Sequence, residues 1–153
     1  VIAAKAVAFG EAMKSNFSAY QKAVVSNAKV LAKELNAGGM RLVSGGTDNH
    51  MVLADLTPLG FTGKQAEEAL GKAYITVNRN AIPYDPKPPR VTSGLRIGTP
   101  SVTSRGFGKT EIEKVAELIL RTLNNIGDET VQNQVQNEVS ELTSLFPIPG
   151  LET

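Results

Sequence analysis

Apolar side chains recur at every third or fourth position over the first 35 residues, the spacing that places them on one face of a helix. Ser15 and Asn16 are both favourable N-cap residues, so two helices are expected to meet there. Gly38-Gly39 is expected to end the second. We interpret the stripe as core-facing, with a partner-binding helix as the alternative, and expect the short first helix to pack against a surface outside this sequence. The stripe consists of Ile2, Ala6, Phe9, Met13, Phe17, Tyr20, Val24, Ala28, Leu31 and Leu35.

After Gly39 the apolar period changes to two, which indicates β-strands. Strands are expected at 41–43, 51–56, 75–77 and 95–97, the first two forming a hairpin. Helices are expected after a capping box of Thr62 and Gln65, after a second box of Thr110 and Glu113, and from about Glu129 to Leu145. This order predicts an α/β fold, a small and mostly antiparallel sheet layered with helices.

Residues 79–93 contain four prolines, which remove amide donors and fix φ, so neither a helix nor a central strand is expected there. Loops of such length are commonly functional. The segment 79–105 is also locally basic and lacks interleaved aromatic residues, which favours a small anion over nucleic acid as its ligand. For Arg79, Lys87 and Arg90 the alternative is ordinary exposed charge. The charged residues of the segment are Arg79, Asp85, Lys87, Arg90, Arg96 and Arg105.

Arg96 differs from the other cations because it stands inside an apolar strand. Its neighbours Leu95 and Ile97 must face the opposite side of the sheet. A covered guanidinium at this position needs a carboxylate or phosphate, to which it offers two parallel donors. The spacing therefore makes Arg96 a candidate anion site, with a plain exposed strand arginine as the alternative.

The composition excludes several kinds of chemistry. The chain has 153 residues, no cysteine and one histidine, His50, so thiolate catalysis is excluded and histidine-based zinc or serine-histidine sites are not expected. We expect His50 to be a hydrogen-bonded structural residue. The net charge of +1 is too small for a nucleic-acid or anionic-membrane surface. There is no apolar run of membrane-spanning length and no signal-peptide pattern, and Val1 is interpreted as a cut end.

A series of motifs resembles serine hydroxymethyltransferase over essentially the whole chain, in a form nearer the bacterial branch. The most specific block is Val91-Thr92-Ser93-Gly94-Leu95-Arg96-Ile97-Gly98-Thr99-Pro100, which follows Asn78-Arg79-Asn80-Ala81-Ile82-Pro83 and Asp85-Pro86 and precedes Ser104-Arg105-Gly106-Phe107. Upstream matches are Lys5-Ala6-Val7-Ala8, Gly45-Gly46-Thr47-Asp48-Asn49-His50, Leu53-Ala54-Asp55-Leu56, Thr62-Gly63 and Ala69-Leu70-Gly71.

The resemblance implies an enzyme that uses pyridoxal phosphate and tetrahydrofolate to interconvert serine and glycine. It also implies that only the C-terminal portion is present, because the motif Thr-Thr-Thr-His-Lys, whose lysine carries the cofactor, does not occur. Residues 1–38 would then lead from the large cofactor domain, and 39–153 would form the small domain of the aminotransferase-like fold. Pyridoxal phosphate is not expected to bind this chain, which should be inactive alone, with neither catalytic residues nor a metal site.

Three residues acquire roles from the resemblance. Arg96 matches the arginine that binds the amino-acid carboxylate, and Asn80 matches an asparagine that contacts the folate pterin, beside a loop from Pro83 to Ser93. Arg105 falls on a family arginine near the site, with a structural ion pair as the alternative. Two departures concern this loop: Pro89 often aligns with serine, and Arg90 stands where an apolar residue is expected.

The implied partners are serine or glycine, folate, and the large domain of the same enzyme, in a cytoplasmic homodimer or homotetramer without nucleic acid or membrane. The alternative is a non-catalytic module that binds folate or another protein. In that case its basic loop residues would suit folate polyglutamate tails or an acidic partner.

Overall fold

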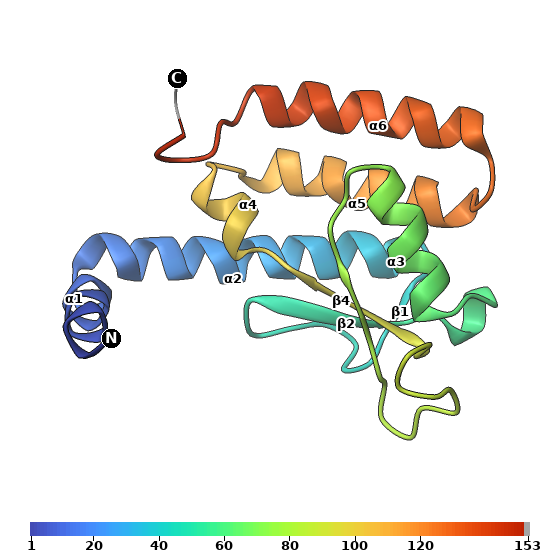
Figure 1. Cartoon of the computed structure of the whole chain (residues 1–153), viewed down its shortest axis with the longest axis horizontal. Helices are drawn as coiled ribbons and strands as arrows, with labels where there is room; N and C mark the ends of the chain where they lie inside the picture. Colours follow the sequence, from blue (N-terminus) through green and yellow to red (C-terminus); the bar gives the residue numbers. More distant parts are fainter. Residues whose placement is uncertain (152–153) are drawn as a thin grey trace.

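A computed structural model describes residues 1–151. Its four strands form one sheet in the order β1-β2-β4-β3, every neighbouring pair is antiparallel, and helices are layered over one face (Figure 1). The predicted α/β fold is therefore confirmed. The elements are α1 (Ile2–Ala12), α2 (Ser15–Ala37), β1 (Arg41–Leu42), β2 (Met51–Asp55), the 3-10 helix η1 (Thr57–Leu59), α3 (Gly63–Lys72), β3 (Asn78–Asn80), β4 (Gly94–Gly98), α4 (Pro100–Ser104), α5 (Lys109–Asn124) and α6 (Glu129–Ser144).

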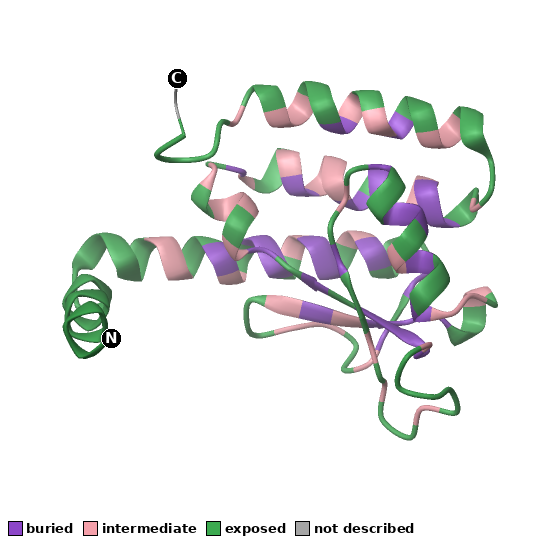
Figure 2. Cartoon of the chain, viewed as in Figure 1, coloured by how far each residue is buried: buried purple, intermediate pink, exposed green. Residues whose placement is uncertain are grey.

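The main core lies between the sheet and α2, α3 and α5. Alternation along the strands determines which side chains enter it: Val52 and Ala54 of β2 and Leu95 and Ile97 of β4 are buried, whereas Arg96 is exposed. Figure 2 shows the same division, with buried residues on the surfaces that α2 and α5 turn toward the other elements. Within residues 1–151, no helix covers the sheet face that carries Arg96 (Figure 1).

The predicted division of the N-terminal stripe is confirmed, because α1 ends at Ala12 and α2 begins at Ser15. Lys14, however, is the N-cap residue of α2. The core-facing interpretation is right for α2 and wrong for α1, none of whose residues is buried (Figure 2). Phe9 and Met13 are 68% and 87% exposed, so the apolar face of α1 has no partner within residues 1–151. Among the described helices, none combines the length and apolar character that crossing a bilayer requires.

The predicted strand at 75–77 is wrong, and β3 lies three residues further on. The helix α3 ends in a turn in which Tyr74 has a φ of 62° and the amide of Ile75 donates to the carbonyl of Leu70. That amide is thus used to end the helix and is not available to a strand. Pairing begins at Asn78, opposite Arg96, so Arg79 and Asn80 belong to the sheet and the irregular loop is shorter than predicted.

One predicted helix start is wrong, and one short helix was not predicted. The capping box of Thr62 and Gln65 is present at α3, as predicted. The box expected at Thr110 is not, because α5 begins earlier and the Glu111 carboxylate accepts a hydrogen bond from the amide of Gly108 at 2.9 Å. Pro100 ends the strand as expected and also opens the short helix α4, which was not predicted.

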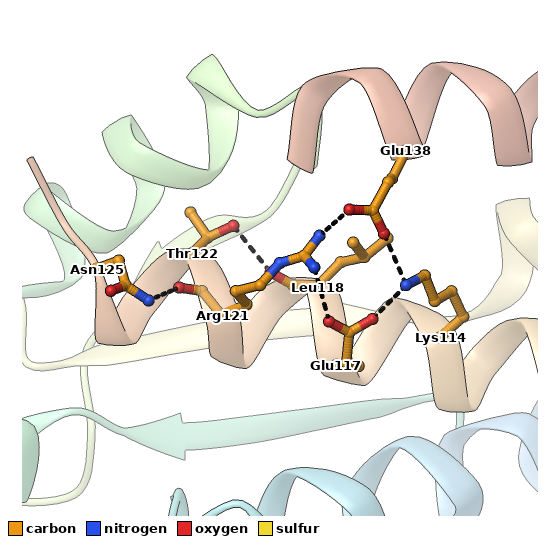
Figure 3. A network of polar contacts seen from close by, with 7 residues as sticks. All are labelled: Lys114, Glu117, Leu118, Arg121, Thr122, Asn125 and Glu138. Carbon is orange, nitrogen blue, oxygen red and sulfur yellow. Dashed lines mark hydrogen bonds and ion pairs between the residues drawn. The ribbon is translucent and has the colours of Figure 1, made fainter. Parts of the chain in front are cut away.

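The last helix, α6, closely follows its predicted range and lies along α5 on the side away from the sheet (Figure 1). Its N-cap is Asp128, and its buried residues Val135 and Val139 pack with Leu118 of α5. An ion-pair network joins the two helices, in which Glu138 of α6 binds Lys114 and Arg121 of α5, and Glu117 binds the same two cations (Figure 3).

Candidate functional site

Arg96 lies on the uncovered face of the sheet, where its guanidinium is exposed to solvent. The residues directly opposite it are Leu53 on β2 and Asn78 on β3. Its Nη2 donates to the Asn78 Oδ1 at 3.3 Å, and no carboxylate of residues 1–151 lies within ion-pair distance of it. The guanidinium is therefore oriented by an amide and retains donors for an external carboxylate, which two parallel hydrogen bonds would hold.

Arg96 lines an open hollow of about 500 Å³ at the end of the sheet where β4 leads into α4. His50 is part of the same lining, and its carbonyl accepts a hydrogen bond from the amide of Thr99 at 3.0 Å. Its imidazole makes no hydrogen bond within residues 1–151, so the expected structural contact belongs to the backbone and not to the ring. The wall consists of His50, Met51, Thr76, Val77, Asn78, Arg96, Gly98, Pro100 and Ser101.

Asn80 lies on the same sheet face as Arg96, two residues beyond Asn78 on β3. It pairs with Gly94, and its side-chain amide donates to the carbonyl of Ala81 at 2.7 Å. A Cβ at Gly94 would stand 2.7 Å from both the Asn80 carbonyl and the Ile82 side chain. The glycine thus allows β3 and the start of the proline-rich loop to approach β4 closely. The structure therefore places the two principal predicted site residues, Arg96 and Asn80, on one surface.

The proline-rich loop is organised by Asp85, to which the sequence analysis gave no role. Its carboxylate accepts hydrogen bonds from the amides of Ile82, Lys87 and Ser93 at 2.9 to 3.1 Å, and from the Ser93 hydroxyl at 2.7 Å. Burial raises the pKa of Asp85, but these four donors outweigh it and lower the pKa to about 2. The available signal was Asp followed by Pro, because aspartate commonly binds the amide two residues on in a turn.

The far end of the loop is fastened to the N-terminus of α3. The amides of Gly63 and Lys64 donate to the carbonyls of Thr92 and Val91 at 2.9 and 3.0 Å. Thr92 adopts a φ of 57°, and its buried hydroxyl has no hydrogen-bond partner within residues 1–151. Such strain persists only where the surrounding structure enforces it. A Cβ at Gly63 would lie 2.3 Å from the Thr92 hydroxyl, so this contact requires glycine.

The other predicted cations are placed differently. Arg79 binds Glu67 of α3 through its side chain at 2.9 Å, and Lys87 and Arg90 are exposed in the loop. Arg105 is directed to the C-terminal end of α6, where its Nε and Nη2 donate to the carbonyls of Phe146 and Thr143 at 2.6 and 2.7 Å. Arg105 therefore does not line the hollow beside Arg96.

The site offers binding groups and little reactive chemistry of its own. Residues 1–151 contain no group of three or more histidine, cysteine, aspartate or glutamate side chains that could hold a metal ion. No lysine lines the hollow beside Arg96. The arrangement is suited to holding a carboxylate at Arg96, and Asn80 lies nearby on the same face of the sheet.

In a comparison with protein families, the family model described as serine hydroxymethyltransferase matches residues 1–119. The matched part runs from α1 into α5 and includes every candidate site residue described above. Helix α6 lies outside the match.

Proposed function

Because this chain belongs to the serine hydroxymethyltransferase family, we propose that it forms the C-terminal domain of an enzyme that interconverts serine and glycine with tetrahydrofolate as the one-carbon carrier. The observation that carries this proposal is the position of Arg96, an exposed guanidinium without a carboxylate partner in residues 1–151, at the edge of an open hollow. A guanidinium in this state matches the arginine that the family resemblance assigns to the carboxylate of serine or glycine.

In this proposal Arg96 holds the substrate carboxylate and thereby fixes the orientation of the α-carbon. Asn78 fixes the guanidinium in turn through its side-chain oxygen. Two parallel hydrogen bonds restrict rotation of the carboxylate, so the reacting bond is presented in one direction.

Asn80 and the loop from Pro83 to Ser93 would contact the folate. The asparagine amide both donates and accepts, which suits a pterin edge. Asp85 keeps the loop in one shape, so less ordering is required when folate binds. This preformed loop supports a binding role.

Pyridoxal phosphate would supply electron withdrawal from the amino acid in the complete enzyme. The described residues do not fit a site for it. Lys64 and Lys72 are exposed on α3, and Lys64 is within 3.7 Å of Glu68. An exposed amine lacks the apolar or cationic surroundings that activate a lysine toward carbonyl groups. We therefore assign cofactor binding to the large domain of the enzyme and propose that this chain is inactive alone.

The exposed apolar face of α1 supports association with that large domain. Ile2, Phe9 and Met13 are more than 60% exposed and have no partner in residues 1–151. Exposed large apolar side chains on one helix are typical of an interface. A cytoplasmic homodimer or homotetramer of the complete enzyme is part of the same proposal. The alternative role as a folate-binding or protein-binding module would use these same two surfaces, and it predicts binding by this chain without the large domain.

The test is to replace Arg96 in the complete enzyme and to measure the dissociation constant of serine. Arg96→Ala should weaken serine binding about tenfold or more, since each charge-assisted hydrogen bond contributes about 1.5 to 3 kcal/mol. Arg96→Lys should restore only part of the affinity, because an ammonium cannot make two parallel bonds. The control Lys22→Ala removes an exposed cation of α2 and should leave serine affinity as it is. Unchanged serine affinity in Arg96→Ala would refute the proposed role of Arg96.

A further inference from the structure

A second hollow lies between the end of the sheet and the helices, next to the hollow at Arg96. It has a volume of about 230 Å³, is partly open to solvent, and is lined by the end of the sheet and by α2, α4, α5 and α6. Its lining is mainly apolar, with Leu31, Ile97, Phe107, Ile119 and Leu142 among the contributors. For comparison, an engineered apolar cavity of about 150 Å³ stays dry and binds benzene. The cavity is therefore large enough for a small organic molecule, which would be bound through apolar contact.

One charged group, the half-buried Arg105, takes part in this otherwise apolar lining. The carbonyls of Thr143 and Phe146 hold two of its nitrogens and so fix the guanidinium plane. Its remaining nitrogen, Nη1, makes no hydrogen bond within residues 1–151, and no carboxylate of these residues pairs with it. The two carbonyls satisfy donors and carry the negative partial charge of a helix C-terminus, but no carboxylate of residues 1–151 adds a full negative charge beside Arg105.

We propose that this cavity binds a small amphiphilic carboxylate, a molecule with an apolar chain of about six carbons, whose carboxylate meets Arg105. The apolar chain would occupy the space between β4, α5 and α6. Thr76 and Ser101 are polar residues among those that line the cavity. The two hollows adjoin, because Thr76, Val77, Gly98 and Ser101 line both, but their cations differ: Arg105 lines only the apolar cavity and Arg96 lines only the open hollow.

The alternative is that Arg105 serves only as a cap for the C-terminal carbonyls of α6, a common role for arginine. These two interpretations of Arg105 predict different ligand preferences for the cavity. If Arg105 only caps α6, the cavity should bind hexanoate and 1-hexanol with equal affinity. A carboxylate site should bind hexanoate about tenfold more tightly than 1-hexanol, and hexylamine least tightly, because one charge-assisted hydrogen bond accounts for such a factor.

The experiment is a titration of the 153-residue chain with hexanoate, 1-hexanol and hexylamine, followed through methyl-group NMR signals. Saturable shifts are expected at Ile119 and Leu142 in the cavity, and not at Leu53 beside Arg96. Equal affinity for hexanoate and 1-hexanol would overturn the role of Arg105. The absence of saturable shifts with all three compounds, or hexanoate shifts at Leu53 alone, would overturn the site itself.

Two variants test the proposal further. Arg105→Gln should reduce hexanoate affinity to that of 1-hexanol, whereas the control Lys22→Gln removes an exposed cation of α2 and should keep the preference. If Arg105→Gln loses α6, Val115→Phe provides an independent test, because Val115 lines the cavity and a larger side chain should fill it. That variant should bind neither compound. Retention of full hexanoate binding in Val115→Phe would place the ligand elsewhere and refute the proposal.

Discussion

Asp85 accepts hydrogen bonds from both the amide and the hydroxyl of Ser93, at 2.9 and 2.7 Å. The two residues are eight positions apart and stand at opposite sides of the proline-rich loop, so one carboxylate closes the loop onto the start of β4. The same group binds the amides of Ile82 and Lys87. A single ionised side chain thus fixes the loop that we propose to contact folate.

The order of the loop should consequently depend on pH. In the folded chain the pKa of Asp85 is lowered to about 2, against about 3.9 for an unperturbed aspartate. A lowered pKa means that the ionised form stabilises the fold, fully at pH values above the unfolded pKa and progressively less as the pH falls toward 2. Carboxyl NMR signals should therefore report titration of Asp85 near pH 2. In Asp85→Asn we expect about tenfold faster amide exchange at Ser93, and titration near 3.9 in the wild type would contradict the predicted role.

Two glycines of α3 should respond in opposite ways to the same substitution. Gly63→Ala would place its Cβ 2.5 Å from the carbonyl of Gly94 and 2.3 Å from the Thr92 hydroxyl, so the loop must move and we expect a loss of about 2 to 3 kcal/mol. Gly71 has no atom within 4 Å of its Cβ position, so Gly71→Ala should stabilise the helix by about 0.5 to 1 kcal/mol. Urea denaturation of both variants gives the free energies of unfolding. Equal effects would show that the close contact at Gly63 is not rigid.

The ion pairs between α5 and α6 should make the attachment of α6 sensitive to salt and acid. The pKa of Glu138 is lowered, chiefly by the hydrogen bond from Lys114 and further by Arg121, so its contribution is present above the unfolded pKa and is lost as the pH falls through the folded one. Because the network is partly exposed, Glu138→Gln should cost about 1 kcal/mol in low salt and less in high salt. Thermal denaturation measures this, with Glu141→Gln on the exposed side of α6 as the control. A salt-independent loss would indicate packing instead of charge.

Local sequence patterns were sufficient to predict an element where its hydrogen bonds join neighbouring residues or where one of its faces is buried. The alternation around Arg96 correctly predicted that Leu95 and Ile97 lie on the opposite face, and the structure buries both. The Thr62 and Gln65 box correctly marked the start of α3, since both of its hydrogen bonds lie within four residues. Element type and the candidate sheet face could therefore be derived from the sequence.

Contacts between residues far apart in the sequence, which can override a local pattern, could not be derived in this way. Ile75-Thr76-Val77 has a strand composition, but the amide of Ile75 closes the end of α3, and this moves the pairing to Asn78. The contacts of Arg105 join residues about 40 positions apart, at the end of a helix whose position depends on packing against α5. Asn78 was missed for the same reason, because its register opposite Arg96 follows from the displaced strand.

Asn78 should act as a positioning residue for Arg96 in the complete enzyme. Asn78→Ala removes the acceptor at 3.3 Å and should raise the KM for serine about threefold to tenfold with a smaller effect on kcat, because it loosens a binding group. Asn78→Asp should be more damaging, since a carboxylate beside Arg96 would compete with the substrate carboxylate. Steady-state kinetics distinguishes the two, with Asn133→Ala on the exposed side of α6 as control. Serine affinity higher in Asn78→Asp than in Asn78→Ala would contradict the assignment of the carboxylate to Arg96.

The 153-residue chain by itself should neither bind pyridoxal phosphate at a specific lysine nor release glycine from serine. Its lysines on α3, Lys64 and Lys72, are exposed, and no lysine lines the hollow at Arg96. An amine in water has neither the desolvation nor the neighbouring cation that would activate it toward a carbonyl compound. The measurement combines borohydride trapping and mass mapping of labelled lysines with an assay of glycine release, and we expect low labelling spread over several exposed lysines. Stoichiometric labelling of one lysine together with turnover would show that this chain carries the cofactor site that we assign to the large domain.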